Sequence, residues 1–293
     1  MAAKVWIDGK YWDKLDAKVS AFDHGVLFGD GVTAGTRLYD GRPFRLDHYL
    51  DLLYLAADGI GLTIPYSQSE LARTVETVVR NNQRREGFVR ILVTRGAGTL
   101  TLDPRKCEPN VVVITESVVL YPRELYDAGL DVIAVATSPT IRMTLSQGPL
   151  ARAKHLALRA GCLDALLHDA NGAVSGATDA ALFLIEGNSA IVPPIEACPD
   201  PVTARFVVEL FAELGIPVVE RPVQRDELFA ATELVLAGQA GEVIALRSVD
   251  GKPIGTGGEG PIARRLRDRY REAVRRSAPS DRDTHGERGT SVP

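Results

Sequence analysis

The sequence lacks the features that define several protein classes. Its three cysteines, Cys107, Cys162 and Cys198, include no CxxC pair, so neither a disulfide framework nor a zinc site of the usual spacing is predicted. No run of about 18 apolar residues indicates a membrane-spanning helix, and the N-terminus has no signal-peptide pattern. We therefore expect a cytoplasmic protein without a metal site and without a membrane partner.

Charge and motifs exclude further functions. Lys and Arg total 34 against 38 Asp and Glu, a net charge of −4, which argues against a nucleic-acid partner. The glycine-rich phosphate motifs and the GxSxG nucleophile motif are absent. Lysine is scarce, so a mechanism that needs a lysine has few candidates. The chain has seven: Lys4, Lys10, Lys14, Lys18, Lys106, Lys154 and Lys252.

Hydrophobic periodicity predicts an α+β chain. Apolar residues alternate over 5–7 and 10–12 around Asp8-Gly9, which is typical of a hairpin. Ser67 and Glu70 form a capping box that predicts a helix to about residue 81. The other expected helices are 46–57, 149–160, 203–214 and 261–274, and the expected strands include 34–38, 88–94, 111–114, 130–136, 180–185, 190–192, 233–237 and 243–246.

The length of 293 residues suits two modest domains. A break at Pro122 and Glu124 separates two sets of elements. We expect a small N-terminal α+β domain over 1–118, a linker over 119–124 and a larger C-terminal domain over 125–276. The polar, charged residues 277–293 indicate a disordered tail.

Several strings match one family in order and spacing. They include FGDGV at 28–32, RLYDG at 37–41, GFVR at 87–90, HDANG at 168–172 and VDGKPIG at 249–255. Over about residues 4–275 the chain resembles the fold-type IV pyridoxal-phosphate enzymes, which include branched-chain and D-amino-acid aminotransferases and aminodeoxychorismate lyases. The resemblance implies a small α+β domain, a larger pseudo-barrel domain, an active site between them, and a homodimer.

The residues that hold pyridoxal phosphate in this family are altered here. Counting from the matched strings puts Met143 at the position of the Schiff-base lysine, Leu52 at that of the phosphate-binding arginine, and Gly176 at that of the glutamate that pairs with the pyridinium nitrogen. The two phosphate-binding turns read Pro-Val-Thr203 and Gly-Gln239-Ala. None of the three replacements carries a charge, and a thioether cannot form an imine. This pattern predicts that no cofactor is bound.

Other polar residues remain in the expected cleft. The candidates for binding a small carboxylate are Arg37, Arg90, Arg142, Gln147 and Thr178, since arginine pairs with carboxylates in bidentate geometry; the alternative is ion pairing between domains or subunits. The weak catalytic candidates are Asp179, Lys154 and His155, with His24 a further acid–base group. Lys154 shares a helical arc with apolar residues, which fits either a low-pKa amine or a lysine whose stem covers the core.

Three functions follow from these residues. The first is a pyridoxal-phosphate-independent enzyme that performs elimination, isomerisation or condensation on a small carboxylate metabolite. The second is a pyridoxal-phosphate-dependent aminotransferase or lyase that uses a displaced lysine, Lys154. The third is a non-catalytic binding or partner subunit. The sequence favours the first, because its family cofactor lacks the usual anchors.

Overall fold

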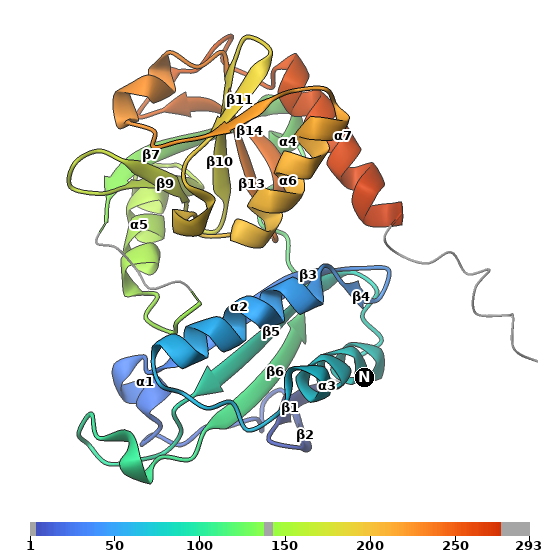
Figure 1. Cartoon of the computed structure of the whole chain (residues 1–293), viewed down its shortest axis with the longest axis vertical. Coiled ribbons are helices and arrows are strands. Elements are labelled where there is room, and N and C mark those ends of the chain that lie inside the picture. Colours follow the sequence, from blue (N-terminus) through green and yellow to red (C-terminus); the bar gives the residue numbers. More distant parts are fainter. Residues whose placement is uncertain (1–3, 138–142, 277–293) are drawn as a thin grey trace, which may run out of the picture.

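The computed structural model describes residues 4–137 and 143–276, which form two lobes, each built around its own sheet (Figure 1). The predicted tail 277–293 and Arg142 lie outside the described residues. Among the described residues, no helix has the length and apolar composition needed to cross a membrane.

The N-terminal lobe contains a six-stranded antiparallel sheet in the order β2-β1-β6-β5-β3-β4. Helices α2 and α3 pack on it and bury a core of leucines and valines such as Leu50, Leu53 and Val75. Its elements are β1 Lys4–Ile7, β2 Lys10–Asp13, α1 His24–Phe28, β3 Gly31–Tyr39, β4 Arg42–Pro43, α2 Leu46–Gly59, α3 Gln68–Asn81, β5 Gly87–Thr94, η1 Pro104–Lys106 and β6 Asn110–Glu116.

Local sequence signals explain this lobe. The β1–β2 hairpin turns at Asp8 and Gly9, both with positive φ, as a type I′ turn requires. The capping box at α3 is present in both directions, with the Ser67 side chain accepting from Glu70 N and the Glu70 side chain accepting from Ser67 N. The predicted hairpin and both predicted helices are therefore confirmed.

The C-terminal lobe contains a curled mixed sheet in the order β12-β11-β10-β13-β14-β7-β8-β9, with β15 paired to β14. A short turn joins β9, at one end of this order, to β10 in its interior, so the sheet curls back on itself. Its elements are α4 Leu125–Ala128, β7 Leu130–Ala136, α5 Gly148–Arg159, β8 Asp164–His168, β9 Val174–Ala177, β10 Ala181–Glu186, β11 Ser189–Val192, η2 Ile195–Ala197, α6 Pro201–Glu213, β12 Val218–Glu220, η3 Arg225–Phe229, β13 Glu233–Gly238, β14 Glu242–Val249, β15 Lys252–Pro253 and α7 Pro261–Arg276.

Three helices of this lobe matter for the site. Helices α6 and α7 pack together against β10 and β13 through aromatic residues that include Phe206, Phe211 and Tyr270. Helix α5 covers β7 and β8 through Ala153 and Ala157. In Figure 1, α5 and α6 extend from the upper lobe toward the lower one. The α+β two-domain fold is confirmed, and the predicted linker falls between β6 and α4.

Candidate functional site

A cavity of about 450 Å³ lies between the two lobes. The N-terminal lobe contributes β3, through Thr33 and Gly35, and β5, through Arg90. The C-terminal lobe contributes the start of α5, the end of β8, the start of β9, the β9–β10 turn, and the residue that follows β13. Backbone hydrogen bonds tie one wall across the lobes, because Thr33 N donates to Met143 O at 2.6 Å.

An acidic cluster lines and underlies one wall. Asp179 faces the cavity from the β9–β10 turn. Burial, followed by the nearby Asp200 carboxylate, raises the pKa of Asp179 to about 7, while the Arg90 guanidinium opposes that rise. Asp164 lies behind Thr178 and accepts its hydroxyl at 2.6 Å and the Tyr121 hydroxyl at 2.7 Å. A carboxyl group whose pKa lies near neutral pH can exchange protons with a bound ligand.

Lys154 lies behind this wall. Its Nζ is 3.5 Å from Asp164 Oδ2 and 5.9 Å from the centre of the Tyr121 ring. Leu150, four residues earlier on the same face of α5, lines the cavity, whereas Lys154 does not. No lysine of the described chain lines the cavity.

A buried carboxylate occupies a cup of donors at the start of α6. Asp200 is the N-cap of α6, and its Oδ1 accepts Thr203 N at 3.1 Å and the Tyr49 hydroxyl at 3.0 Å. Its Oδ2 accepts Gln239 N at 3.0 Å. Asp200 and Thr203 are fully buried. We call Tyr49, Asp200, Thr203 and Gln239 the α6 cup; its donors converge as they would on an anion at a helix N-terminus.

The remaining altered positions hold no charge that faces the cavity. Met143 lines it as a thioether. Leu52 packs on the core of the N-terminal lobe, and α2 instead reaches the cup through Tyr49. Gly176 is buried, and a Cβ there would lie 2.5 Å from Ala180 O.

The predicted ligand-binding residues divide between two places. Arg90, Gln147 and Thr178 line the cavity. Arg37 does not, because its guanidinium donates to Ala240 O at 2.6 Å and lies 3.6 Å from a Glu242 carboxylate oxygen. Exposed His155 likewise lies outside the cavity lining.

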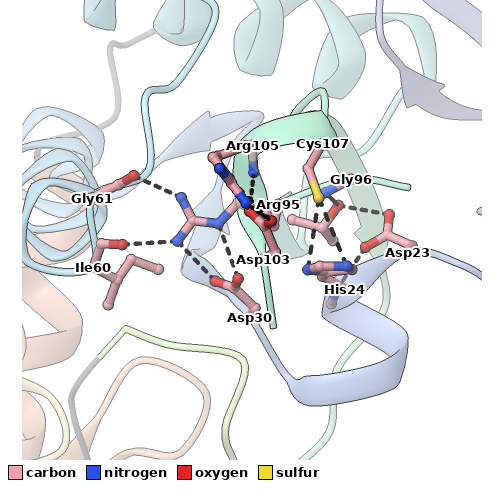
Figure 2. Close-up of polar contacts among 12 residues, drawn as sticks. Asp23, His24, Asp30, Ile60, Gly61, Arg95, Gly96, Asp103, Arg105 and Cys107 are labelled. Carbon is pink, nitrogen blue, oxygen red and sulfur yellow. Dashed lines mark hydrogen bonds and ion pairs between the residues drawn. The ribbon is translucent and has the colours of Figure 1, made fainter. Parts of the chain in front are cut away.

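His24 also lies away from the cavity, in the cluster of Figure 2. Its Nε2 is 2.9 Å from Thr99 O, and the Cys107 sulfur is 3.7 Å from both ring nitrogens. A sulfur equidistant from both nitrogens is aligned with neither N–H direction, and burial raises the pKa of the thiol. Nearby, Arg95 holds Asp30 and the carbonyls of Ile60 and Gly61 (Figure 2). This cluster braces α1 and is not a nucleophile–base pair.

Comparison with known proteins identifies relatives over nearly the whole chain. The family model for amino-transferase class IV matches residues 31–249. A Methanocaldococcus jannaschii protein, provisionally named a branched-chain-amino-acid aminotransferase, is 34% identical and covers 92% of this chain and 96% of its own length. The D-alanine aminotransferase of Bacillus licheniformis is 28% identical, covering 92% and 97%. A branched-chain amino acid aminotransferase from T.th., solved with pyridoxamine 5′-phosphate, superposes with a TM-score of 0.89 at 29% identity, covering 95% and 96%.

These relatives overturn the prediction of a pyridoxal-phosphate-independent enzyme without a cofactor. They are named aminotransferases, and one is a complex with pyridoxamine phosphate, so they favour the cofactor-dependent alternative that names Lys154. The α6 cup has the donors of a phosphate site, but Asp200 accepts from all of them, so the cup fits a phosphate only if Asp200 releases these donors. By sequence and by fold, the chain belongs to the class IV aminotransferases.

Proposed function

We propose that this protein is an aminotransferase that exchanges an amino group between an amino acid and a 2-oxo acid in the cavity between the lobes. The observation that carries the proposal is its similarity, over 92% of the chain, to a relative named a branched-chain aminotransferase. The cofactor proposed is pyridoxal phosphate, which when bound supplies an electron sink for the substrate's α-carbon.

Arg90 is the proposed anchor for the substrate carboxylate. It projects from β5 into the cavity and forms no ion pair among the described residues. Its guanidinium carbon lies 5.4 Å from the centre of the Phe88 ring, which orients it by a cation–π contact. A guanidinium at the cavity wall favours bidentate binding of a carboxylate. This interaction suits any amino or oxo acid, so the side-chain specificity rests elsewhere in the cavity.

Lys154 is the proposed lysine that carries the cofactor. Its side chain is 31% exposed, and its charge lowers the pKa of the cavity-lining Asp179, which places the amine near the acidic wall. The other lysines lie outside the cavity lining: Lys4 pairs with Asp13, and Lys14 with Glu116. Lys154 must part from Asp164 to act, because its Nζ lies 3.5 Å from Asp164 Oδ2 and outside the cavity lining.

Reduction and peptide mapping test this assignment. The full chain with pyridoxal phosphate should absorb above 400 nm, lose that band with borohydride, and carry the reduced cofactor on the Lys154 peptide. Lys154→Gln should abolish the band and the transaminase activity, whereas Lys252→Gln, in the exposed strand β15, should change neither. A chain that never develops the band, or a label on another lysine, would reject the role of Lys154.

We also propose a homodimer in which a second copy covers an apolar patch on the N-terminal lobe. We call it the α1 patch; it consists of the exposed residues Phe22, Val26, Leu27, Phe28, Leu100 and Leu102. Its two segments are joined, because Gly98 N donates to Phe22 O at 3.0 Å. The chain that follows α1 contacts the other lobe, since Leu145 N donates to Gly31 O at 3.0 Å. Apolar patches of this kind mark interfaces.

Light scattering tests the dimer. We expect a mass of twice the 31.6 kDa chain, and the double change Val26→Lys and Leu102→Lys should halve it. Val219→Lys, at a half-exposed valine of the other lobe, is the matched control and should leave the dimer intact. A monomeric wild-type protein would refute the proposal.

A further inference from the structure

The α6 cup presents an arrangement that the family resemblance does not anticipate. Three donors from three separate segments converge on a single carboxylate: Tyr49 from α2, Thr203 from α6, and Gln239 from the end of β13. Thr203 Oγ1 also lies 3.1 Å from the Tyr49 hydroxyl. A helix N-terminus and converging donors favour a negative charge, and here the chain supplies that charge itself.

A second feature is an unsatisfied acceptor beside the cup. Gln239 is 9% exposed and is one of the cavity-lining residues, and its side-chain Oε1 is buried without a hydrogen-bond partner among the described residues. A buried carbonyl oxygen without a donor is costly. A singly protonated phosphate carries both negative oxygens for the backbone donors and a P–OH donor for such an acceptor.

The ionisable groups that interact with Asp200 do not compensate the charge of a second anion. They are Asp179 of the β9–β10 turn, Tyr49 of α2 and Tyr270 of α7, and none of them is positively charged. No lysine or arginine of the described residues pairs with Asp200. A phosphate in the cup would stand beside an ionised carboxylate in a buried site, where like charges repel strongly.

We propose that ionised Asp200 is an internal anion that closes the α6 cup, so that a phosphate or phosphate ester enters only when Asp200 has lost its charge. Protonation of Asp200 converts it from an acceptor for three donors into a neutral group that a phosphate can displace. The inference rests on the proposed function only in taking a phosphate-bearing cofactor as the natural ligand. Burial raises the pKa of Asp200, while the hydrogen bonds that its carboxylate accepts oppose that rise.

Calorimetric titration of the full chain with inorganic phosphate tests the proposal without the cofactor or Lys154. Asp200→Ser removes the charge and keeps a hydroxyl for the helix N-cap. At pH 7.5 we expect Asp200→Ser to bind phosphate at least about 50-fold more tightly than the wild type, from the loss of a like charge at close range. Glu196→Gln removes a charge from the cavity rim outside the cup and should change binding less than about 3-fold.

The pH dependence is the second arm. Phosphate binding by the wild type should tighten as the pH falls from 7.5 to 5.5, although phosphate itself loses negative charge over that range. Phosphate binding by Asp200→Ser should weaken or stay constant over the same range. Equal affinities of wild type and Asp200→Ser at both pH values would overturn the proposal. Asp200→Asn removes the charge with little change in side-chain shape and should also bind phosphate more tightly than the wild type. A circular-dichroism melt of each variant shows whether it is folded, so that weak binding by a misfolded variant is recognised. If the wild type and Asp200→Ser bind phosphate as expected but the wild type does not catalyse transamination, the result would count against the proposed function alone.

Discussion

Replacing Gly176 by glutamate, the residue that the family resemblance gives at this position, is expected to unfold the C-terminal lobe rather than to restore a cofactor contact. Gly176 has φ +143, which side chains rarely adopt. A Cβ there would lie 2.5 Å from Ala180 O and 2.8 Å from Pro199 Cδ, and neither atom belongs to a flexible side chain. Strain and overpacking together should lower the free energy of unfolding by more than about 4 kcal/mol.

A graded series separates this strain from the loss of glycine itself. Gly176→Ala adds only the offending Cβ and should cost about 2 to 4 kcal/mol in urea unfolding. Gly148→Ala, at the first residue of α5 with nothing within 4 Å of the added Cβ, should be neutral or stabilise by up to about 1 kcal/mol. If Gly176→Ala proved as stable as wild type, the turn would be open enough for a side chain, and the glutamate could be rebuilt.

This closed turn shows what the sequence can and cannot predict. Periodicity locates β7 at Leu130–Ala136 and the capping box locates α3, because both patterns are local. Short elements escape such patterns: α1 has only five residues, and β9 and β12 have four and three. Their pairing partners, rather than their own composition, make them regular.

The site depends still more on contacts between distant residues. Counting from matched strings identifies which side chain stands at a family position, such as Met143, but not which other side chain reaches the same point in space. Asp200 meets Tyr49 across 151 positions and Gln239 across 39. A local signal for Asp200 is present, since an aspartate before Pro201 is a typical N-cap. Interpreting the lost anchors as a lost cofactor therefore goes beyond what the count supports.

The carboxyl group of Asp179 also predicts how stability depends on pH. The pKa of Asp179 is about 7 in the folded protein against a usual value of 3.8. Between these values the folded state keeps a proton that the unfolded chain has released, so the free energy of unfolding falls as the pH rises from about 4 to 7. Above that window Asp179 is ionised beside Asp200, and its full electrostatic cost is present.

Asp179→Asn removes this cost and is expected to stabilise the protein at pH 8 by about 2 to 4 kcal/mol, a rise in Tm of roughly 5 to 10 °C. At pH 4 the gain should vanish, because the wild-type carboxyl is then neutral in the folded state. Thermal melts of both proteins across this range measure the difference, and Asp226→Asn, at an exposed carboxylate of η3, controls for net charge. An equal gain at pH 4 and pH 8 would mean that shape and hydrogen bonding, not charge, set the effect. A gain confined to high pH would show that the fold holds the neighbouring carboxylates of Asp179 and Asp200 at a cost in stability. Binding of a proton, or pairing of Asp179 with an arginine, would then relieve that cost.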